Sequence, residues 1–378
     1  MDTPRPPLGL YIHVPWCVRK CPYCDFNSHT FQGDLPEKAY LDALLEDLDH
    51  DLDLVRERPV TSVFIGGGTP SLMSAGFYQQ LFRRLEQRLG FTAGAEITLE
   101  ANPGTIEQGR FSGYREAGIN RLSLGIQSFD PAQLARLGRI HNEQDAHRAI
   151  EAAYHAGFDN LNLDLMHGLP GQTTDQAIAD LQAAITWRTP HLSWYQLTLE
   201  PNTEFYSRPP ELPEDEALWD IWQAGSDTLN SAGFSAYEIS AWSRPGMESR
   251  HNLNYWTFGD YLAIGAGGHG KASLANGDIL RYWKTRQPDA YLKRIGSRTA
   301  GTQPIEREER GLEFMMNALR LKRGVEESMF EARTGLPLTS IAAILEGLRK
   351  EGLLEPGRLQ ATPLGQRYLN SVLERFLS

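Results

Sequence analysis

Cysteine is scarce in this sequence of 378 residues. The chain has three, Cys17, Cys21 and Cys24, and all of them fall within eight residues. An odd number of closely spaced cysteines argues against a disulfide framework. Such an arrangement fits a compartment in which thiols stay reduced, because disulfides are rare there.

Two further absences narrow the class of protein. No apolar run approaches the roughly 20 residues that a membrane-spanning helix needs, so we expect no membrane span. Residues 1–10 show no charged stretch that leads into an apolar one, which leaves no visible signal peptide. We therefore expect a cytoplasmic protein.

A surplus of positive charge is also missing. The chain has 37 Lys and Arg against 48 Asp and Glu, so its net charge is −11, and the arginines are scattered among acids. A chain of this charge is not attracted to phosphate backbones, and we expect no nucleic-acid partner. Hydrophobic residues make up 41% and charged residues 22%, which is typical of a folded globular protein. The length predicts about two or three structural units, one of them large.

Short β-rich runs alternate with amphipathic helical stretches over the first 240 residues. The strand candidates begin near Leu8, Val60, Glu96, Arg121, Asn160, His191 and Phe234. Helical periodicity covers residues 36–56, 74–90, 106–117, 142–156, 174–186 and 215–232. This alternation is typical of parallel strands with helices outside, and it predicts an α/β fold with an open sheet or a barrel.

Polar residues and glycines gather where these strands end. Gly66, Gly67 and Gly68 follow the second run, Glu100 closes the third, and Gln127 closes the fourth. Asp164 lies in the fifth run. The carboxyl ends of parallel strands form the active face of β/α barrels, so we expect these side chains to share a site. The alternative is that acids and glycines merely begin loops.

The pattern changes after residue 240. Residues 241–302 are rich in Gly, Trp, Tyr and Arg, and Asn276-Gly277 predicts a hairpin. Helical patterns then dominate residues 307–321, 325–334, 339–351 and 363–377. Residues 304–378 carry eleven Lys or Arg and eleven Asp or Glu, which leaves no charge for binding a duplex. A covering or docking domain is the preferred interpretation.

The three cysteines follow the first predicted strand in the string YIHVPWCVRKCPYC (11–24). Iron–sulfur clusters are held by thiolates, usually four for a cubane. Three thiolates leave one iron open, which can chelate the amino and carboxylate groups of a small molecule. A zinc site completed by His13 or His29 is the alternative that the spacing allows.

The pattern Cys-x3-Cys-x2-Cys after a first strand resembles the radical S-adenosylmethionine (SAM) superfamily. The string YIHVPWCVRKCPYCDFN resembles its oxygen-independent coproporphyrinogen III oxidase-like branch and, within it, the heme chaperone family HemW. Similar strings are IGGGTPS (65–71), LEANPG (99–104), LGIQSF (124–129), GRIH (138–141), NLDLMHGLPGQT (162–173), HLSWYQLTLEPNT (191–203) and HNLNYW (251–256). The resemblance covers the whole chain. It implies a partial (β/α)6-type barrel in residues 1–240, a connecting segment in 241–302 and a mainly helical, winged-helix-like domain in 303–378.

The resemblance also implies a [4Fe–4S] cluster on Cys17, Cys21 and Cys24, with SAM at the open iron. A carboxylate such as Glu100 can accept hydrogen bonds from ribose hydroxyls, and Arg139 can pair with the SAM carboxylate as a planar fork. Salt bridges or helix caps are the alternative roles for these charged residues. The positions that match the SAM-binding residues of the branch are Tyr11, Tyr23, Gly67, Gly68, Thr69, Glu100, Gln127, Arg139 and Asp164.

The string HNLNYW distinguishes the heme chaperones of the branch. A histidine imidazole is a normal ligand of heme iron, although a histidine beside aromatic residues is also common in protein cores. The heme-binding positions implied by the resemblance are His251, Asn252, Tyr255 and Trp256. Residues 265–270 match G-x-G-x-x-G, but a hairpin rather than a helix is predicted after them, so we expect no dinucleotide site. His269 is a second candidate for heme.

Two functions follow from the resemblance. One is a chaperone that delivers heme to acceptor proteins, membrane-bound respiratory enzymes among them; the other is an oxidase that decarboxylates coproporphyrinogen III. The true oxidases carry a fourth cysteine two positions after the third, and Phe26 stands there in this chain. This difference favours the chaperone. The residues leave open whether SAM is cleaved or only bound, whether one or two SAM molecules bind, and whether the chain forms a homodimer.

Overall fold

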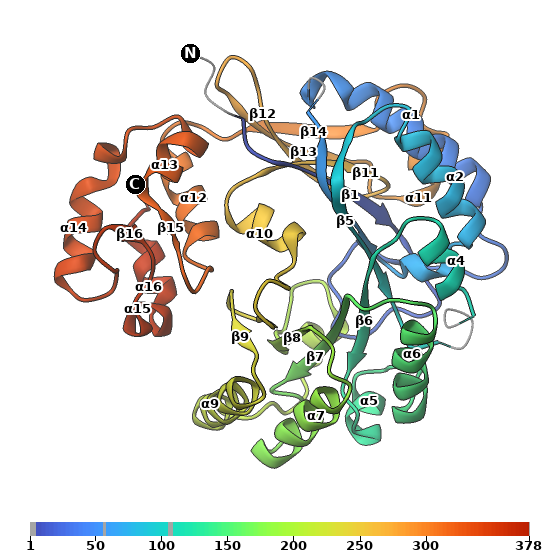
Figure 1. The fold of residues 1–378 in the computed structure, drawn as a ribbon, viewed down its shortest axis with the longest axis horizontal. Helices are drawn as coiled ribbons and strands as arrows, with labels where there is room; N and C mark the ends of the chain where they lie inside the picture. Colours follow the sequence, from blue (N-terminus) through green and yellow to red (C-terminus); the bar gives the residue numbers. More distant parts are fainter. Residues whose placement is uncertain (1–4, 56–57, 105–108, 378) are drawn as a thin grey trace.

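The computed structural model describes residues 5–55, 58–104 and 109–377 (Figure 1). Within these ranges twelve strands form one sheet, and seven neighbouring strands of it run parallel. Six of the seven come from the first 240 residues. They are β1 (Leu8–Val14), β4 (Val60–Gly67), β5 (Phe91–Ala101), β6 (Arg121–Gln127), β7 (Leu161–His167) and β8 (His191–Gln196). The predicted α/β architecture with parallel strands is confirmed.

The sheet continues beyond β1 with strands from the segment 241–302. β11 (Asp260–Ile264) pairs parallel with β1. β12 (His269–Ser273), β13 (Ile279–Lys284) and β14 (Thr299–Pro304) follow in antiparallel order. The hairpin predicted at Asn276-Gly277 is confirmed, and Gly277 has a φ of +87°, which glycine adopts without strain.

The opposite edge of the sheet differs from the prediction of one parallel strand after Phe234. Two short strands form there, β9 (Ser235–Ala236) and β10 (Ala241–Ser243). The chain bends between them, and the returning strand β10 pairs antiparallel with β8. The sequence after Phe234 predicts a single strand, because its pattern of hydrophobic residues does not reveal this bend.

Helices cover the outer face of the parallel strands (Figure 1). They include α1 (Glu37–Val55), α2 (Ala75–Leu85), α4 (Phe111–Glu116), α5 (Pro131–Arg136), α6 (Glu143–His155), α7 (Thr174–Thr186) and α9 (Asp215–Ser231). Reciprocal side-chain and backbone hydrogen bonds cap two of them, at Asn142 for α6 and at Thr173 for α7. Residues 56 and 106–108 of the predicted helices 36–56 and 106–117 lie outside the described residues.

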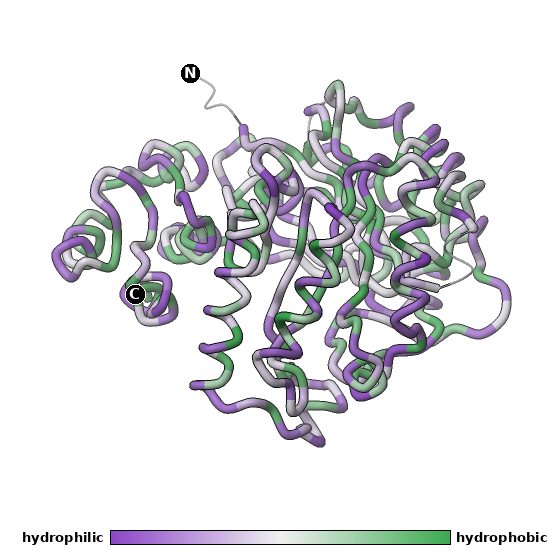
Figure 2. Tube along the Cα trace, turned by 60° about the horizontal axis from the view of Figure 1, so that its bottom comes forward, coloured by the Kyte–Doolittle hydropathy of each residue, from purple (hydrophilic) through white to green (hydrophobic). Residues whose placement is uncertain are grey.

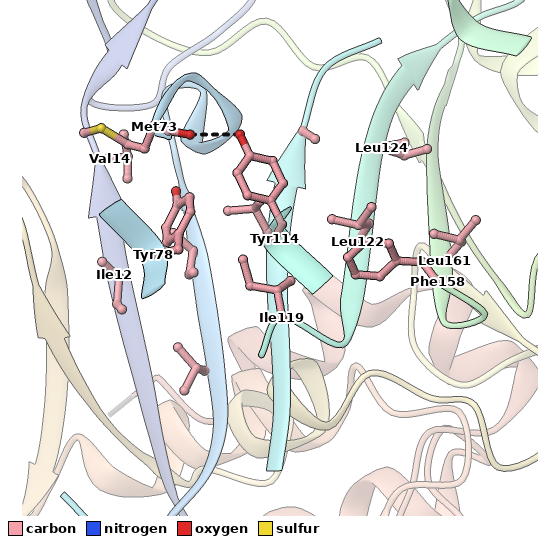
Figure 3. Packing of buried hydrophobic residues seen from close by; sticks show 14 of the residues in the cluster. Ile12, Val14, Met73, Tyr78, Tyr114, Ile119, Leu122, Leu124, Phe158 and Leu161 are labelled. Atoms are coloured by element: carbon pink, nitrogen blue, oxygen red, sulfur yellow. Dashed lines mark hydrogen bonds between the residues drawn. The ribbon is translucent and has the colours of Figure 1, made fainter. Parts of the chain in front are cut away.

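The main hydrophobic core lies between the strands and these helices. Side chains alternate along β1, so that Leu10 and Ile12 enter the core while Tyr11 lies on the inner face of the sheet. Figure 3 shows the packing on the outer side, where the hydroxyl of Tyr114 donates to the carbonyl of Met73 at 2.8 Å. Outer helices alternate between hydrophobic and hydrophilic residues along the tube in Figure 2, as expected for helices with one buried face.

The C-terminal residues form a mainly helical unit around a second hydrophobic core, which Phe258 and Ile279 of the preceding segment also join. It contains α12 (Arg310–Ala318), α13 (Glu327–Thr334), α14 (Ala342–Lys350), α15 (Pro363–Arg367), α16 (Leu369–Glu374) and the antiparallel pair β15 (Val325–Glu326) and β16 (Arg358–Leu359). Phe314, Phe330 and Leu348 are fully buried in this core. The short helix α10 (Arg250–Trp256) lies between this unit and the sheet (Figure 1). None of the helices described is long and apolar enough to cross a bilayer.

Candidate functional site

The three cysteines lie in a loop that begins where β1 ends. β2 (Trp16–Cys17) and β3 (His29–Thr30) pair with each other and close this loop. Each sulfur has a polar neighbour: Thr69 Oγ1 lies 3.4 Å from that of Cys17, and a guanidinium nitrogen of Arg139 lies 3.6 Å from that of Cys21. Cys24 Sγ lies 3.9 Å from a serine hydroxyl of the same loop. Burial raises the pKa of Cys17 and of Cys24, and the hydrogen-bond donors beside these thiols oppose this effect by favouring the thiolate form that binds metal.

The cysteines share one cavity of about 270 Å³ with the carboxyl ends of the parallel strands. Its lining includes Cys17, Cys21, Cys24, Tyr23, Gly67, Gly68, Thr69, Glu100, Gln127, Arg139 and Asp164. Tyr11, the remaining position of the expected SAM set, is half-buried on the inner face of β1 and is not among the lining residues. The strand-end positions of the sequence prediction are therefore brought together around the thiols.

Two carboxyl groups, those of Glu100 and Asp164, line this cavity. Burial, together with the negative charge of Asp164, raises the pKa of Glu100 to about 8, although the N–H of Gly67 donates to its carboxylate at 3.3 Å. Burial also raises the pKa of Asp164, against the effect of hydrogen bonds from Ser123 (2.7 Å) and Asn162 (2.8 Å). A ligand that brings hydroxyl donors or a positive charge would relieve the cost of two buried carboxylates.

Arg139 is held rigidly beside the cysteine loop. Its Nη2 donates to Asn102 Oδ1 at 2.6 Å and to the carbonyl of Gly125 at 2.7 Å. The amide of Asn102 donates in turn to Thr69 Oγ1 at 3.2 Å. This network joins the ends of β4, β5 and β6. Asn102 is a lining residue that the sequence reasoning missed, although it lies in the string LEANPG.

Gln127 adopts an unusual backbone conformation at the end of β6. Its φ is +69°, a region that non-glycine residues rarely occupy and that is frequent at functional sites. Its side-chain Oε1 accepts a hydrogen bond of 2.7 Å from the hydroxyl of Tyr195, which also lines the cavity. Tyr195 was not predicted, because the string HLSWYQ gives no sign of which of its residues reach the cavity.

The glycine run at the end of β4 lets the strand end pack against the cysteine loop. Gly67 has a φ of +113°, and a Cβ on it would lie 2.6 Å from the ring of His13. A Cβ on Gly68 would lie 2.5 Å from the carbonyl oxygen of Trp16, and its N–H donates to the carbonyl of Val14 at 2.7 Å. Side chains at these positions would push the cysteine loop away from the strand ends.

The surroundings of His13 do not fit the zinc alternative. Its Nε2 lies 2.8 Å from the carbonyl of Asn27, and its Nδ1 lies 3.0 Å from the hydroxyl of Tyr11. The carbonyl can only accept, so Nε2 carries the proton and Nδ1 accepts from Tyr11. Both ring nitrogens are used, and burial lowers the pKa of His13 to about 4. His29 also turns to Asn27, with 3.3 Å between Nε2 and Oδ1.

The HNLNYW string forms α10 on the inner side of the sheet. The ring of His251 is buried, stacks on Phe64 at 4.5 Å and meets the edge of Tyr255 at 4.5 Å. Burial, followed by the charge of Arg121, lowers the pKa of His251 to about 3, so the imidazole is neutral. None of the described cavity-lining residues comes from α10.

The other expected heme positions on α10 point to different neighbours. The amide of Asn252 donates to the hydroxyl of Tyr237 at 3.1 Å. Trp256 is covered by the guanidinium of Arg320, 4.2 Å from its ring, on the side of the C-terminal unit. His269, the second candidate for heme, lies on β12 and is exposed. The helix α10 thus connects the inside of the sheet with the C-terminal unit.

Known families match both parts of the chain. Residues 11–184 match the model of the Radical SAM superfamily, and residues 305–368 match that of the HemN C-terminal domain. The chain is 49% identical to the heme chaperone HemW of Escherichia coli strain K12, over 99% of each chain. It is 48% identical to the heme chaperone HemW of Haemophilus influenzae, over 99% of this chain and 98% of that relative.

A solved structure has the same fold. The coproporphyrinogen III oxidase HemN from Escherichia coli, described as a radical SAM enzyme, superposes with a TM-score of 0.83. The match covers 99% of this chain and 91% of that chain, at 23% sequence identity. At that identity the likeness shows the fold and not the reaction.

Proposed function

The chain belongs to the heme chaperone HemW family, and from that premise we propose that it binds heme and delivers it to acceptor proteins. The observation that carries the proposal is the identity of 49% with a heme chaperone over 99% of both chains. An identity that extends over both the barrel and the C-terminal unit supports a common function more strongly than a shared fold.

The radical SAM domain binds a [4Fe–4S] cluster and SAM. We propose that Cys17, Cys21 and Cys24 ligate the cluster, which when bound offers one iron without a protein ligand to the amino and carboxylate groups of SAM. Three thiols on one cavity, next to the hydrogen-bond donors of Thr69 and Arg139, suit this group.

The remaining cavity residues have the chemistry to hold SAM. We propose that Glu100 accepts hydrogen bonds from the ribose and that the guanidinium of Arg139 orients the carboxylate of SAM. The carboxyl group of Asp164 supplies negative charge that favours a cationic ligand in the cavity. The lining of the same cavity includes Gln127, Tyr23 and Thr69. Tyr11 contributes indirectly, because its hydroxyl is hydrogen-bonded to the ring of His13 and holds that ring in place.

For heme we propose the segment His251, Asn252, Tyr255 and Trp256. The neutral imidazole of His251 is the form that binds iron, and its Nδ1 is buried without a hydrogen-bond partner among the described residues. An orphaned buried nitrogen is costly, which supports a ligand role. The ring is 4% exposed, so ligation requires α10 to shift away from Phe64.

The experiment is a heme titration and transfer assay with the anaerobically reconstituted chain. We expect about four irons and four sulfides per chain, binding of heme, and its transfer to a heme-free acceptor protein. We expect no conversion of coproporphyrinogen III in the presence of SAM and a reductant, because Phe26 stands where the oxidases carry a fourth cysteine. Rapid formation of protoporphyrinogen would overturn the assignment, as would failure to bind heme.

The organisation of the chain and its partners complete the proposal. We propose that residues 1–240 form the cofactor-binding barrel, 241–302 the connecting segment and 303–378 a docking domain. The second hydrophobic core supports this division, since it is built mainly from the C-terminal helices and joined by Phe258 and Ile279 of the connecting segment. We propose a cytoplasmic location, because free thiols persist in a reducing compartment. Membrane-bound respiratory enzymes are the proposed acceptors, and a homodimer is the proposed assembly.

A further inference from the structure

A chain of hydrogen bonds, buried at its centre and half-buried at its two ends, crosses the inside of the barrel from α10 to the cavity. The amide of Asn252 lies 3.1 Å from the hydroxyl of Tyr237, which lies 3.0 Å from Nε2 of His191. Nδ1 of His191 lies 2.6 Å from Oδ1 of Asn162, whose amide nitrogen lies 2.8 Å from Asp164. The members come from α10, from the bend after β9, from β8 and from β7. In the sheet β7 pairs with β8, and β10 lies between β8 and β9.

The chemistry of the groups fixes the direction of every bond. The carboxylate of Asp164 can only accept, so Asn162 donates its amide and offers its Oδ1 to His191. His191 then carries its proton on Nδ1, and its Nε2 accepts from Tyr237. The hydroxyl of Tyr237 is left to accept from Asn252. All four donors therefore point toward Asp164, and bonds aligned in this way strengthen one another.

The chain is enclosed and its members have further partners. His191 is 1% exposed, and burial, followed by the charge of Arg121, holds its pKa well below the ordinary value, which keeps it singly protonated. Asn162 donates a second hydrogen bond of 2.7 Å to Ser123 Oγ, which itself donates to Asp164. Breaking one link leaves a buried polar group unsatisfied, which is costly away from water.

We propose that His191 and Tyr237 are positioning residues that couple the cavity to α10. A ligand that engages Asp164 fixes the donors behind it, and through Tyr237 it fixes Asn252 and the helix that carries it. The inference rests on the proposed function, which has SAM at Asp164 and heme on α10. Because coupling between two sites is reciprocal, heme changes the affinity for SAM by the same factor by which SAM changes the affinity for heme.

The coupling is measured with the cluster-reconstituted chain in anaerobic titrations of SAM with and without heme, and of heme with and without SAM. For the wild type we expect each ligand to change the dissociation constant of the other by about five-fold or more. We also expect SAM alone to slow hydrogen exchange of the amides of residues 250–256. Tyr237→Phe keeps the ring and removes both bonds of the hydroxyl, so the factor should fall to about one while each ligand alone still binds.

A matched control is Tyr154→Phe, which removes a hydroxyl bonded at 2.9 Å to the carbonyl of Trp187, outside the chain of bonds. This variant should keep the wild-type factor. If Tyr237→Phe does not fold, Asn252→Ala breaks the chain of hydrogen bonds at its α10 end, where the side chain is only half-buried. In this variant SAM should no longer slow the hydrogen exchange of α10, and this measurement needs no heme.

Two results would overturn the coupling alone: a factor of one in a wild type that binds both ligands, or a Tyr237→Phe variant that keeps the full factor and the protection of α10. A wild type that binds no SAM or no heme would instead overturn the proposed function, and the coupling with it.

Discussion

The side chain of Asn27 fills the space that a Cβ would take at Gly267: its amide nitrogen lies 2.2 Å from that position. The same nitrogen donates to the carbonyl of Ala266 at 3.0 Å, and the carbonyl of Asn27 accepts from His13. The cysteine loop is thereby fastened to a turn 239 residues further along the chain. This contact explains why residues 265–270 match G-x-G-x-x-G: the glycines leave room for the cysteine loop to pack against this turn, and they do not form a nucleotide site.

Replacing Gly267 by Ala should therefore release the cluster. The new methyl group would displace Asn27 and with it the end of the cysteine loop, so we expect iron and sulfide per chain to fall to less than half. Gly277→Ala is a matched control, since Gly277 has nearly the same φ (+87° against +86°) but no neighbour within 4 Å of its Cβ position. Both variants should lose about 1–3 kcal/mol of stability from backbone strain. Equal iron contents in the two variants would contradict the role given to Gly267.

The sequence predicts the parallel strands because their signals are local. Strand β1 alternates between core residues such as Ile12 and inner residues such as Tyr11, and this pattern is visible without the structure. The pairing of β11 with β1 is not visible, since it joins Leu8 to Asp260 and depends on contacts between distant segments. Periodicity specifies which element forms but not which neighbour it meets.

The same limit applies to the site. Three cysteines within eight residues predict the cluster-binding loop, and polar residues at strand ends indicate which side chains surround it. Asn102 and Tyr195 were missed because their places follow from hydrogen bonds to Arg139 and Gln127. Residues that hold other residues leave little trace in spacing or composition, whereas residues that bind a ligand directly are often part of a recognisable string.

The raised pKa of Glu100 predicts a pH-dependent stability of the chain without cluster or SAM. The folded state holds this proton up to about pH 8, whereas the ordinary pKa of the group is 4.5. The unfolded state binds fewer protons in this window, so stability falls as the pH rises from about 4.5 to 8. Glu100→Gln removes this titration. Between pH 5.5 and pH 8 the thermal midpoint of the wild type should therefore fall relative to that of the variant. A change of 1 kcal/mol corresponds to roughly 2 °C.

The control for this measurement is Glu116→Gln, at an exposed position of α4. The pH curve of this variant should run parallel to that of the wild type. If Glu100→Gln also runs parallel, the carboxyl group is not held protonated by its surroundings, and the description of the cavity would have to change.

Arg139→Lys should weaken SAM binding while the cluster content stays within the range of the wild type. Lysine keeps the charge but lacks the planar fork, which pairs with a carboxylate through two bonds. Hydrogen bonds between charged groups contribute about 1.5–3 kcal/mol, so we expect a dissociation constant raised by roughly ten-fold or more. Calorimetry under anaerobic conditions measures it. Arg136→Lys is the control, because Arg136 bonds the carbonyl of Pro170 at 2.6 Å and does not line the cavity. Equal losses in both variants would rule out a specific pairing.

His251→Ala should change the absorption spectrum of bound heme, because it removes the proposed ligand of the iron. Heme iron ligated by an imidazole has a spectrum that depends on that bond. We expect the cluster content to stay unchanged, since α10 supplies none of the described residues that line the cysteine cavity. Trp256→Leu should weaken heme binding and leave the spectrum unaltered, since an indole packs against a porphyrin but gives no bond to iron.

A spectral change could also come from the loss of any buried histidine that supports the fold, and His167→Ala separates the two causes. Like His251, His167 is buried and contacts an aromatic ring, with its own ring tilted 4.2 Å from that of Trp194, and burial lowers its pKa to about 4. It belongs to β7 and not to α10. Circular dichroism should show similar folding in both variants, so a spectral change in His251→Ala alone identifies the ligand. If both variants keep the spectrum of the wild type, His269 on β12 is the next residue to replace, because its exposed ring can reach iron without a movement of α10.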